Sequence, residues 1–126
     1  MTTMMPPKPA YKRGDVILVL FPDSNLRTAK PRPALVVQAD NLQTGLSQFI
    51  VAMITSRMFR ASHPSRVTIL LSTPEGRQSG LLTNSVVMTD NLATIAESEI
   101  DRVIGFLPMG KVNTALRHTL GLRTYT

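Results

Sequence analysis

The chain is organised around the stretch Lys30-Pro31-Arg32-Pro33-Ala34-Leu35-Val36-Val37-Gln38, in which two prolines bracket one arginine and an apolar run follows at once. Proline fixes φ and donates no backbone hydrogen bond, so Pro31 and Pro33 are expected outside a strand or at its mouth. The apolar residues after them predict a buried strand over residues 34–39. Arg32 is then held at a stiff corner, where it is either a candidate site residue or the partner of a surface carboxylate.

Short apolar runs joined by hairpin-length connections make up most of the chain. Besides residues 34–39, such runs predict strands over residues 16–21, 48–55, 66–71, 85–89, 94–95 and 103–107. Residues 58–64 and 72–80 contain proline or glycine and predict irregular loops. Because strands and helices do not alternate along the chain, a doubly wound parallel sheet is not expected.

The hydrophobic spacing changes near the end of the sequence. Apolar residues recur there at close to the helical period, at Met109, Val112, Leu116 and Leu120. Gly121 follows where a C-capping glycine would stand, so an amphipathic helix is predicted. Two successive Ser/Thr-x-x-acid patterns, over residues 94–97 and 98–101, predict a short capped helical turn. The expected fold class is mainly β with α: a small, strongly curved antiparallel barrel with the helix packed across it.

The length of 126 residues predicts a single domain over residues 11–126, after a proline-rich, disordered tail over residues 1–10. No apolar run approaches the roughly 18 residues of a membrane span, so no membrane helix is expected. The N-terminus lacks the apolar segment of a signal peptide, which makes the cytoplasm the expected location. Cysteine is absent, and this excludes disulfides and thiolate metal sites.

The net charge of +6 is unevenly distributed. Residues 1–70 hold nine Lys or Arg against three Asp or Glu, whereas residues 71–126 hold five against five. A basic face of this kind favours a polyanion, nucleic acid first, with an acidic protein partner as the alternative. The candidates for contact with a nucleic-acid backbone lie in or beside two predicted loops, and they are Arg27, Lys30, Arg57, Arg60 and Arg66.

Polar residues stand at the ends of neighbouring predicted strands. Arg32 stands at the entrance of one strand, and Thr55 and Ser56 stand at the exit of the next. Because an antiparallel hairpin brings such ends to one edge, Arg32 and Thr55 are expected on the same rim. Asp90 stands at the exit of another strand. A fixed cation with hydroxyl donors can bind a phosphodiester and stabilise the charge that builds on it.

RNA supplies its own nucleophile, the 2′-hydroxyl group, so a metal-free protein needs only to position it, move protons and neutralise the phosphorus centre. The sequence leaves the proton acceptor open among Asp23, His63 and Asp90. His63 and His118 do not make a metal-ligand cluster, and neither a metal nor another cofactor is expected.

Several motifs of residues 12–122 resemble one known family. They are Gly14-Asp15-Val16 with Phe21-Pro22, Arg32-Pro33-Ala34-Leu35-Val36-Val37, Ile54-Thr55-Ser56, and Val86-Val87 through Asp90 to Thr94-Ile95. Together they are similar to the MazF/PemK toxins. The resemblance implies an SH3-like barrel with a C-terminal helix, a homodimer, and metal-independent, sequence-selective cleavage of single-stranded RNA. It also implies a cognate antitoxin, whose acidic tail would occupy the basic groove.

By motif match, Arg32 corresponds to the catalytic arginine of that family and Thr55 to its catalytic threonine. Our hypothesis adds Ser56, next to Thr55 in the sequence, as an assisting hydroxyl group. Asp90 corresponds to an acidic residue of the PemK branch, in which a second functional arginine stands where this chain has Met88. Two alternatives stay open. One is a non-catalytic SH3-like module that binds a protein or nucleic acid, and the other is a gyrase poison like the CcdB relatives.

Overall fold

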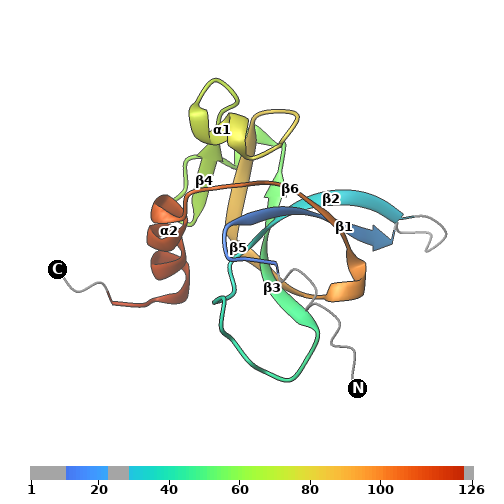
Figure 1. Ribbon diagram of the computed structural model, residues 1–126. Coiled ribbons are helices and arrows are strands. Elements are labelled where there is room, and N and C mark those ends of the chain that lie inside the picture. The colour runs from blue at the N-terminus through green and yellow to red at the C-terminus, as the bar shows by residue number, and fades with distance from the viewer. Residues whose placement is uncertain (1–10, 23–28, 124–126) are drawn as a thin grey trace, which may run out of the picture.

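The computed structural model describes residues 11–22 and 29–123, and these form a curved sheet with two helices (Figure 1). The strands are β1 (Asp15–Pro22), β2 (Ala29–Val36), β3 (Gln48–Thr55), β4 (Arg66–Ile69), β5 (Ser85–Ala96) and β6 (Ile100–Phe106). The helices are α1 (Pro74–Gln78) and α2 (Gly110–Leu120), with 3₁₀ turns at Met58–Arg60 and Glu97–Glu99. The predicted tail over residues 1–10 lies outside the described residues.

All strands pair antiparallel, in the order β4-β5-β3-β2-β1-β6. Figure 1 shows the strong curvature of the sheet, and α2 packs against β4 and β5. The predicted fold class, mainly β with a C-terminal helix, is therefore confirmed. Within the described residues the edge strands β4 and β6 do not pair, so the curved sheet stays open instead of closing into a barrel. None of the described helices is long and apolar enough to span a membrane.

Successive residues of the central strands pack into two separate apolar clusters. One cluster contains Val16 and Leu35 together with Val112 of α2. The other contains their sequence neighbours Ile17 and Val36. Since neighbouring side chains of a strand point to opposite faces, the sheet is covered by apolar side chains on both faces. This explains why the sequence shows continuous apolar runs in place of a polar–apolar alternation.

Helix α2 ends where the sequence predicts. Gly121 takes a φ of 69°, and its N–H group donates to carbonyl groups of the last helical turn. This left-handed cap is favourable for glycine because it carries no Cβ. Near the same end, the Thr119 hydroxyl oxygen lies 2.7 Å from the hydroxyl oxygen of Thr89 on β5. Helix α2 is therefore fixed to the sheet by a hydrogen bond as well as by apolar packing.

The predicted start of the second strand is wrong, because β2 begins at Ala29 and contains both prolines. Residues 29–35 pair with β1, whereas pairing with β3 is confined to residues 34–36. The first half of β2 therefore has an open side toward β3. Proline is tolerated there because an open edge requires no backbone donor.

Three other expectations also need correction. The predicted loop over residues 72–80 contains the short helix α1, which the Thr73 side chain caps. The strand expected over residues 85–89 and the separate piece over 94–95 are parts of one long strand, β5. The turn at Glu97–Glu99 is a 3₁₀ turn whose N-cap makes no side-chain hydrogen bond, so the predicted capping is wrong.

Candidate functional site

The candidate site lies where β2 and β3 separate. The register pairs Ala34 with Met53, and its continuation by two residues places Arg32 opposite Thr55. The strands no longer pair at that point, and a cavity of about 1060 Å³ opens between them. This cavity, called the cleft from here on, is lined by Arg32, Thr55 and Ser56 among others, so the expected shared rim is present.

The described lining of the cleft is positively charged. Its ionisable side chains are Lys30, Arg32, Arg57, Arg60 and Arg102, and none of the described lining residues is Asp, Glu or His. Arg102 is paired with the neighbouring Asp101 at 2.9 Å. An anion that enters the cleft therefore meets several cations with no carboxylate in the described wall to compete for them.

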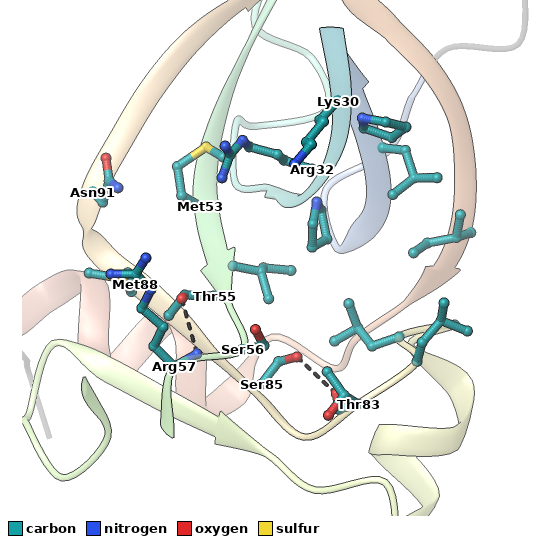
Figure 2. A pocket seen from close by; sticks show the side chains of 18 of the residues that line it. Lys30, Arg32, Met53, Thr55, Ser56, Arg57, Thr83, Ser85, Met88 and Asn91 are labelled. Carbon is teal, nitrogen blue, oxygen red and sulfur yellow. Dashed lines mark hydrogen bonds between the residues drawn. The ribbon is translucent and has the colours of Figure 1, made fainter. Parts of the chain in front are cut away.

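Arg32 and Thr55 approach the cleft from its two sides. The prolines on either side restrict the backbone of Arg32, whose side chain points across the cleft toward Met53 of β3 (Figure 2). Thr55 ends β3, and its Oγ1 accepts a hydrogen bond from the backbone N–H group of Arg57 at 3.1 Å. Because this bond uses the oxygen as an acceptor, the hydroxyl proton is free to donate. The cleft thus offers a cation and an O–H donor to one anion.

Arg60 is held at the cleft wall by two weak contacts. Its Nη1 lies 3.8 Å from the sulfur of Met88, and its guanidinium carbon lies 5.7 Å from the ring centroid of Phe59. Met88 stands where the PemK branch, by the motif match above, has a second arginine. In this chain a guanidinium group from the Met58–Arg60 turn stands beside that position.

Strand β5 carries a three-residue bulge beside the cleft. Met53 of β3 pairs with Met88, whereas the preceding residue, Ala52, pairs with Leu92. Residues 89–91 therefore have no partner on β3. A bulge of this kind bends its strand and turns side chains away from the regular alternation.

The side chains of the bulge point to three different places. The Thr89 hydroxyl lies against that of Thr119 on α2. Asp90 accepts a hydrogen bond from Arg66 on β4, and their charged groups are 2.9 Å apart. Asn91 lines the cleft. Of two residues that the sequence placed at the site, Asp90 and Arg66, neither lines the cleft, because they form an ion pair beside it.

The hydrogen bond from Arg66 lowers the pKa of Asp90 from its ordinary value of 3.8. Burial acts in the opposite direction and is the smaller effect, while the charges of Arg66 and His63 lower the pKa further. Asp90 is therefore held as a carboxylate, with a weaker tendency to take up a proton than an ordinary aspartate.

His63 also lies outside the cleft lining. Its Nδ1 accepts a hydrogen bond from the Ser65 N–H group at 3.1 Å, which places the ring proton of the neutral form on Nε2. The His118 ring lies 6.1 Å away, centroid to centroid. The described ranges contain no group of three His, Asp or Glu side chains able to hold a metal ion. The other predicted candidates, Asp23 and Arg27, lie outside the described residues.

Several polar residues of the cleft, Asn91 and Arg102 among them, are not predicted from the sequence. Arg102 follows Asp101 on the short strand β6, and no spacing marks it as a site residue. The pair Asp90-Asn91 is a weak signal, since two turn-forming residues interrupt an otherwise β-rich segment.

Comparison with known proteins agrees with this geometry. The family model described as PemK-like, MazF-like toxin of type II toxin-antitoxin system matches residues 12–120. A Staphylococcus saprophyticus protein named Endoribonuclease MazF is 30% identical over 117 residues, which cover 90% of this chain and 93% of that protein.

Solved structures show the same similarity. An endoribonuclease in complex with its cognate antitoxin, from a mycobacterial species, is 26% identical with a TM-score of 0.68, and the match covers 92% of this chain and 100% of that one. A MazE–MazF crystal structure from Deinococcus radiodurans, at 18% identity and a TM-score of 0.67, covers 90% and 97% and shows the fold alone. Because the family model matches nearly all of the described residues of this chain, the chain belongs to the PemK-like, MazF-like toxins of type II toxin–antitoxin systems.

Proposed function

We propose that this toxin is an endoribonuclease that cleaves single-stranded RNA, mRNA included, without a metal ion. The observation that carries the proposal is the meeting of Arg32 and Thr55 in a cleft whose described ionisable lining is entirely cationic. A phosphodiester is an anion, and a guanidinium group matches its oxygens in charge and geometry. The names of the similar Staphylococcus and mycobacterial proteins, both endoribonucleases, support the same activity.

The reaction uses the nucleophile that RNA carries. The 2′-oxygen attacks the adjacent phosphorus, an O–P bond forms, and the bond to the 5′-oxygen breaks. The 2′-oxygen loses one proton and the 5′-oxygen gains one, which leaves a 2′,3′-cyclic phosphate and a 5′-hydroxyl. Arg32 neutralises the charge that grows on the non-bridging oxygens, and Thr55 donates its hydroxyl proton to one of them. Ser56, exposed next to Thr55, provides a second hydroxyl donor.

The remaining cations of the cleft position the substrate. Lys30, Arg57 and Arg60 bind phosphates on either side of the cleaved bond, since all three line the cleft. Arg66 contributes less to RNA binding because its charge is already matched by Asp90. A carboxylate that is paired in this way and has a lowered pKa is a weak proton acceptor. We therefore assign Asp90 to the support of the β5 bulge and give it no proton-transfer role.

Cleavage of a single-stranded RNA in EDTA tests the proposal. Arg32→Ala is expected to lower the rate roughly 10²- to 10³-fold, because it removes a group that stabilises the transition state, and Thr55→Ala is expected to lower it less. Arg117→Ala is the matched control, since Arg117 is an exposed arginine of α2 outside the cleft lining. Circular dichroism checks that each variant is folded. Undiminished cleavage by folded Arg32→Ala would reject the assignment, and intact RNA with the wild-type protein would favour a binding module.

The same cleft is the proposed docking site for the acidic segment of a cognate antitoxin. The similar mycobacterial endoribonuclease was solved together with its antitoxin, which supports a partner of this kind. We further propose a homodimer that acts in the cytoplasm, where translated mRNA is present. An acidic antitoxin peptide should compete with RNA for the cleft, and light scattering measures the oligomeric state. If the peptide does not displace RNA, the antitoxin segment and RNA bind at different sites, and the proposed docking in the cleft is wrong.

A further inference from the structure

We propose that Asn91 determines specificity by hydrogen-bonding one base of the bound RNA, next to the phosphate held by Arg32. The inference rests on the proposed RNA cleavage and names the residue that selects among substrates. The bulge of β5 is what brings Asn91 to the cleft. Met53 pairs with Met88 there, so Asn91 has no partner on β3 at the point where the cleft opens. Bulges commonly re-aim a side chain in this way beside active sites.

The three side chains of the bulge differ in their partners. Thr89 is buried and is bonded to the Ser65 carbonyl group, and Asp90 is paired with Arg66. The Asn91 amide has no hydrogen-bond partner within residues 11–22 and 29–123, and its side chain is exposed at the cleft. Two members of the bulge thus hold the strand in place, while the third presents an amide to whatever occupies the cleft.

The surroundings of Asn91 suit a nucleobase. Met53 and Ala93 line the same cleft and are partly exposed, so they offer apolar surface to a flat ring, whereas Met88 also lines it but is almost fully buried. Thioether side chains adapt to a flat ring, and a base combines apolar faces with a polar edge. In the view of Figure 2, Met53 lies between Asn91 and the guanidinium group of Arg32. A base lying over Met53 would place its edge at Asn91 and its phosphate on the Arg32 side.

The chemistry of the amide predicts how a substitution changes the preferred base. Asparagine presents an acceptor oxygen and a donor NH₂ group, so it matches a base edge with a neighbouring donor and acceptor. Guanine is the one RNA base that presents two neighbouring donors, N1–H and N2–H₂, on its Watson–Crick edge. A carboxylate only accepts hydrogen bonds and matches that pair of donors. Asn91→Asp, which preserves the shape of the side chain, should therefore move the preference toward guanine.

The experiment compares cleavage rates in EDTA for sets of four single-stranded RNAs that differ in one nucleotide, at each position flanking the cleaved bond. With Asn91→Asp, guanine is expected to gain roughly tenfold over the other bases at one position and at no other. With Asn91→Ala, discrimination at that same position is expected to fall by a similar factor. Asn41→Asp is the matched control, since it makes the same change of charge in an exposed segment outside the cleft lining.

Each outcome decides between supporting and overturning the inference. A change of base order at one position in Asn91→Asp, or lost discrimination there in Asn91→Ala, supports it. If the wild-type protein cleaves RNA and both variants keep its order of preferred bases at every position, the role of Asn91 is overturned. The proposed function then still stands. A uniform loss of rate also overturns it, because that result assigns Asn91 to the RNA backbone or to the fold. RNA left intact by wild-type protein overturns the proposed function and this inference together.

Discussion

The ion pair between Arg66 and Asp90 joins β4 to β5 at the bulge. Its charged atoms are 2.9 Å apart, and the two side chains keep 24% and 33% of their surface exposed. Solvent therefore screens the attraction, and a pair of this kind contributes less than about 1 kcal/mol to the free energy of unfolding. Arg66 also donates to the carbonyl oxygen of Arg60 at 2.9 Å. The pair thus connects the bulge to the turn that carries one of the cleft arginines.

Asp90→Asn is expected to lower the free energy of unfolding slightly at pH 7, by less than about 1 kcal/mol. The folded protein holds Asp90 at a pKa below its ordinary 3.8, so ionisation stabilises the fold above the unfolded pKa. That contribution disappears as the pH falls through the lower, folded pKa. Urea unfolding of both proteins between pH 7 and pH 2 should therefore show two stabilities that converge at the acid end. A difference that stays constant with pH would trace the effect to something other than this ion pair.

Some residues of the site can be placed from the sequence, and others cannot. Arg32 and Thr55 are predictable as neighbours because an antiparallel hairpin determines which strand ends share an edge. The partner of Asp90 is not predictable, because Arg66 stands 24 residues away in the sequence and contacts Asp90 only through the pairing of β4 with β5. Asn91 is the least predictable, because the bulge is marked only by the weak signal of two turn-forming residues, Asp90 and Asn91, within a β-rich segment.

Two glycines bring the connection between α1 and β5 into direct backbone contact with β6. A Cβ atom built on Gly80 would lie 2.0 Å from the carbonyl oxygen of Ile104, and one built on Gly105 would lie 2.3 Å from that of Gln78. Gly80 also takes a φ of 72°, which L-residues rarely adopt. Because Gly80 and Ile104 both line the cleft, this contact sets one of its walls.

Gly80→Ala is expected to lower the free energy of unfolding by roughly 2–4 kcal/mol. About half of this loss comes from the left-handed backbone conformation of residue 80, and the rest comes from the displacement of β6 by the added Cβ atom. Gly45→Ala provides the control, because Gly45 has a φ of 78° and nothing within 4 Å of the added Cβ. That variant should lose only the backbone contribution, about 1–2 kcal/mol. Urea denaturation measures both values, and equal losses would show that β6 moves aside at no cost.

Among the secondary-structure elements, those with a strong internal pattern are predictable. Helix α2 combines apolar residues at helical spacing with a capping glycine, and its end at Leu120 and Gly121 matches the prediction. The start of β2 is not predictable in this way, because Pro31 and Pro33 normally exclude a strand. They are accommodated since β3 leaves their side of β2 unpaired, and this depends on the curvature of the whole sheet.

Across the whole molecule, the uneven distribution of charge along the sequence becomes a local concentration of charge in space. Four of the five cations in the described lining of the cleft come from the first 70 residues, as the excess of Lys and Arg there predicts. Arg102 is the exception, and its charge is paired with Asp101. The ion pairs found among the described residues involve none of Lys30, Arg32, Arg57 and Arg60.

RNA binding should therefore depend steeply on salt. Each phosphate neutralised on a single strand contributes about −0.7 to the slope of log K against log salt concentration, so four cations predict a slope of roughly −3. Titration of a 2′-O-methyl RNA, which lacks the nucleophile and stays intact, measures this slope at several salt concentrations. Arg57→Ala should make it shallower by about 0.7, because one phosphate contact is lost, while Arg117→Ala should leave it unchanged.

The two variants remove the same charge from the molecule and differ only in whether the charge stood in the cleft. An equal effect of both would mean that RNA responds to the net charge of the whole protein. A slope that changes with Arg57→Ala alone would place the RNA backbone along the cleft, where Arg32 and Thr55 can reach the phosphate next to the 2′-hydroxyl group.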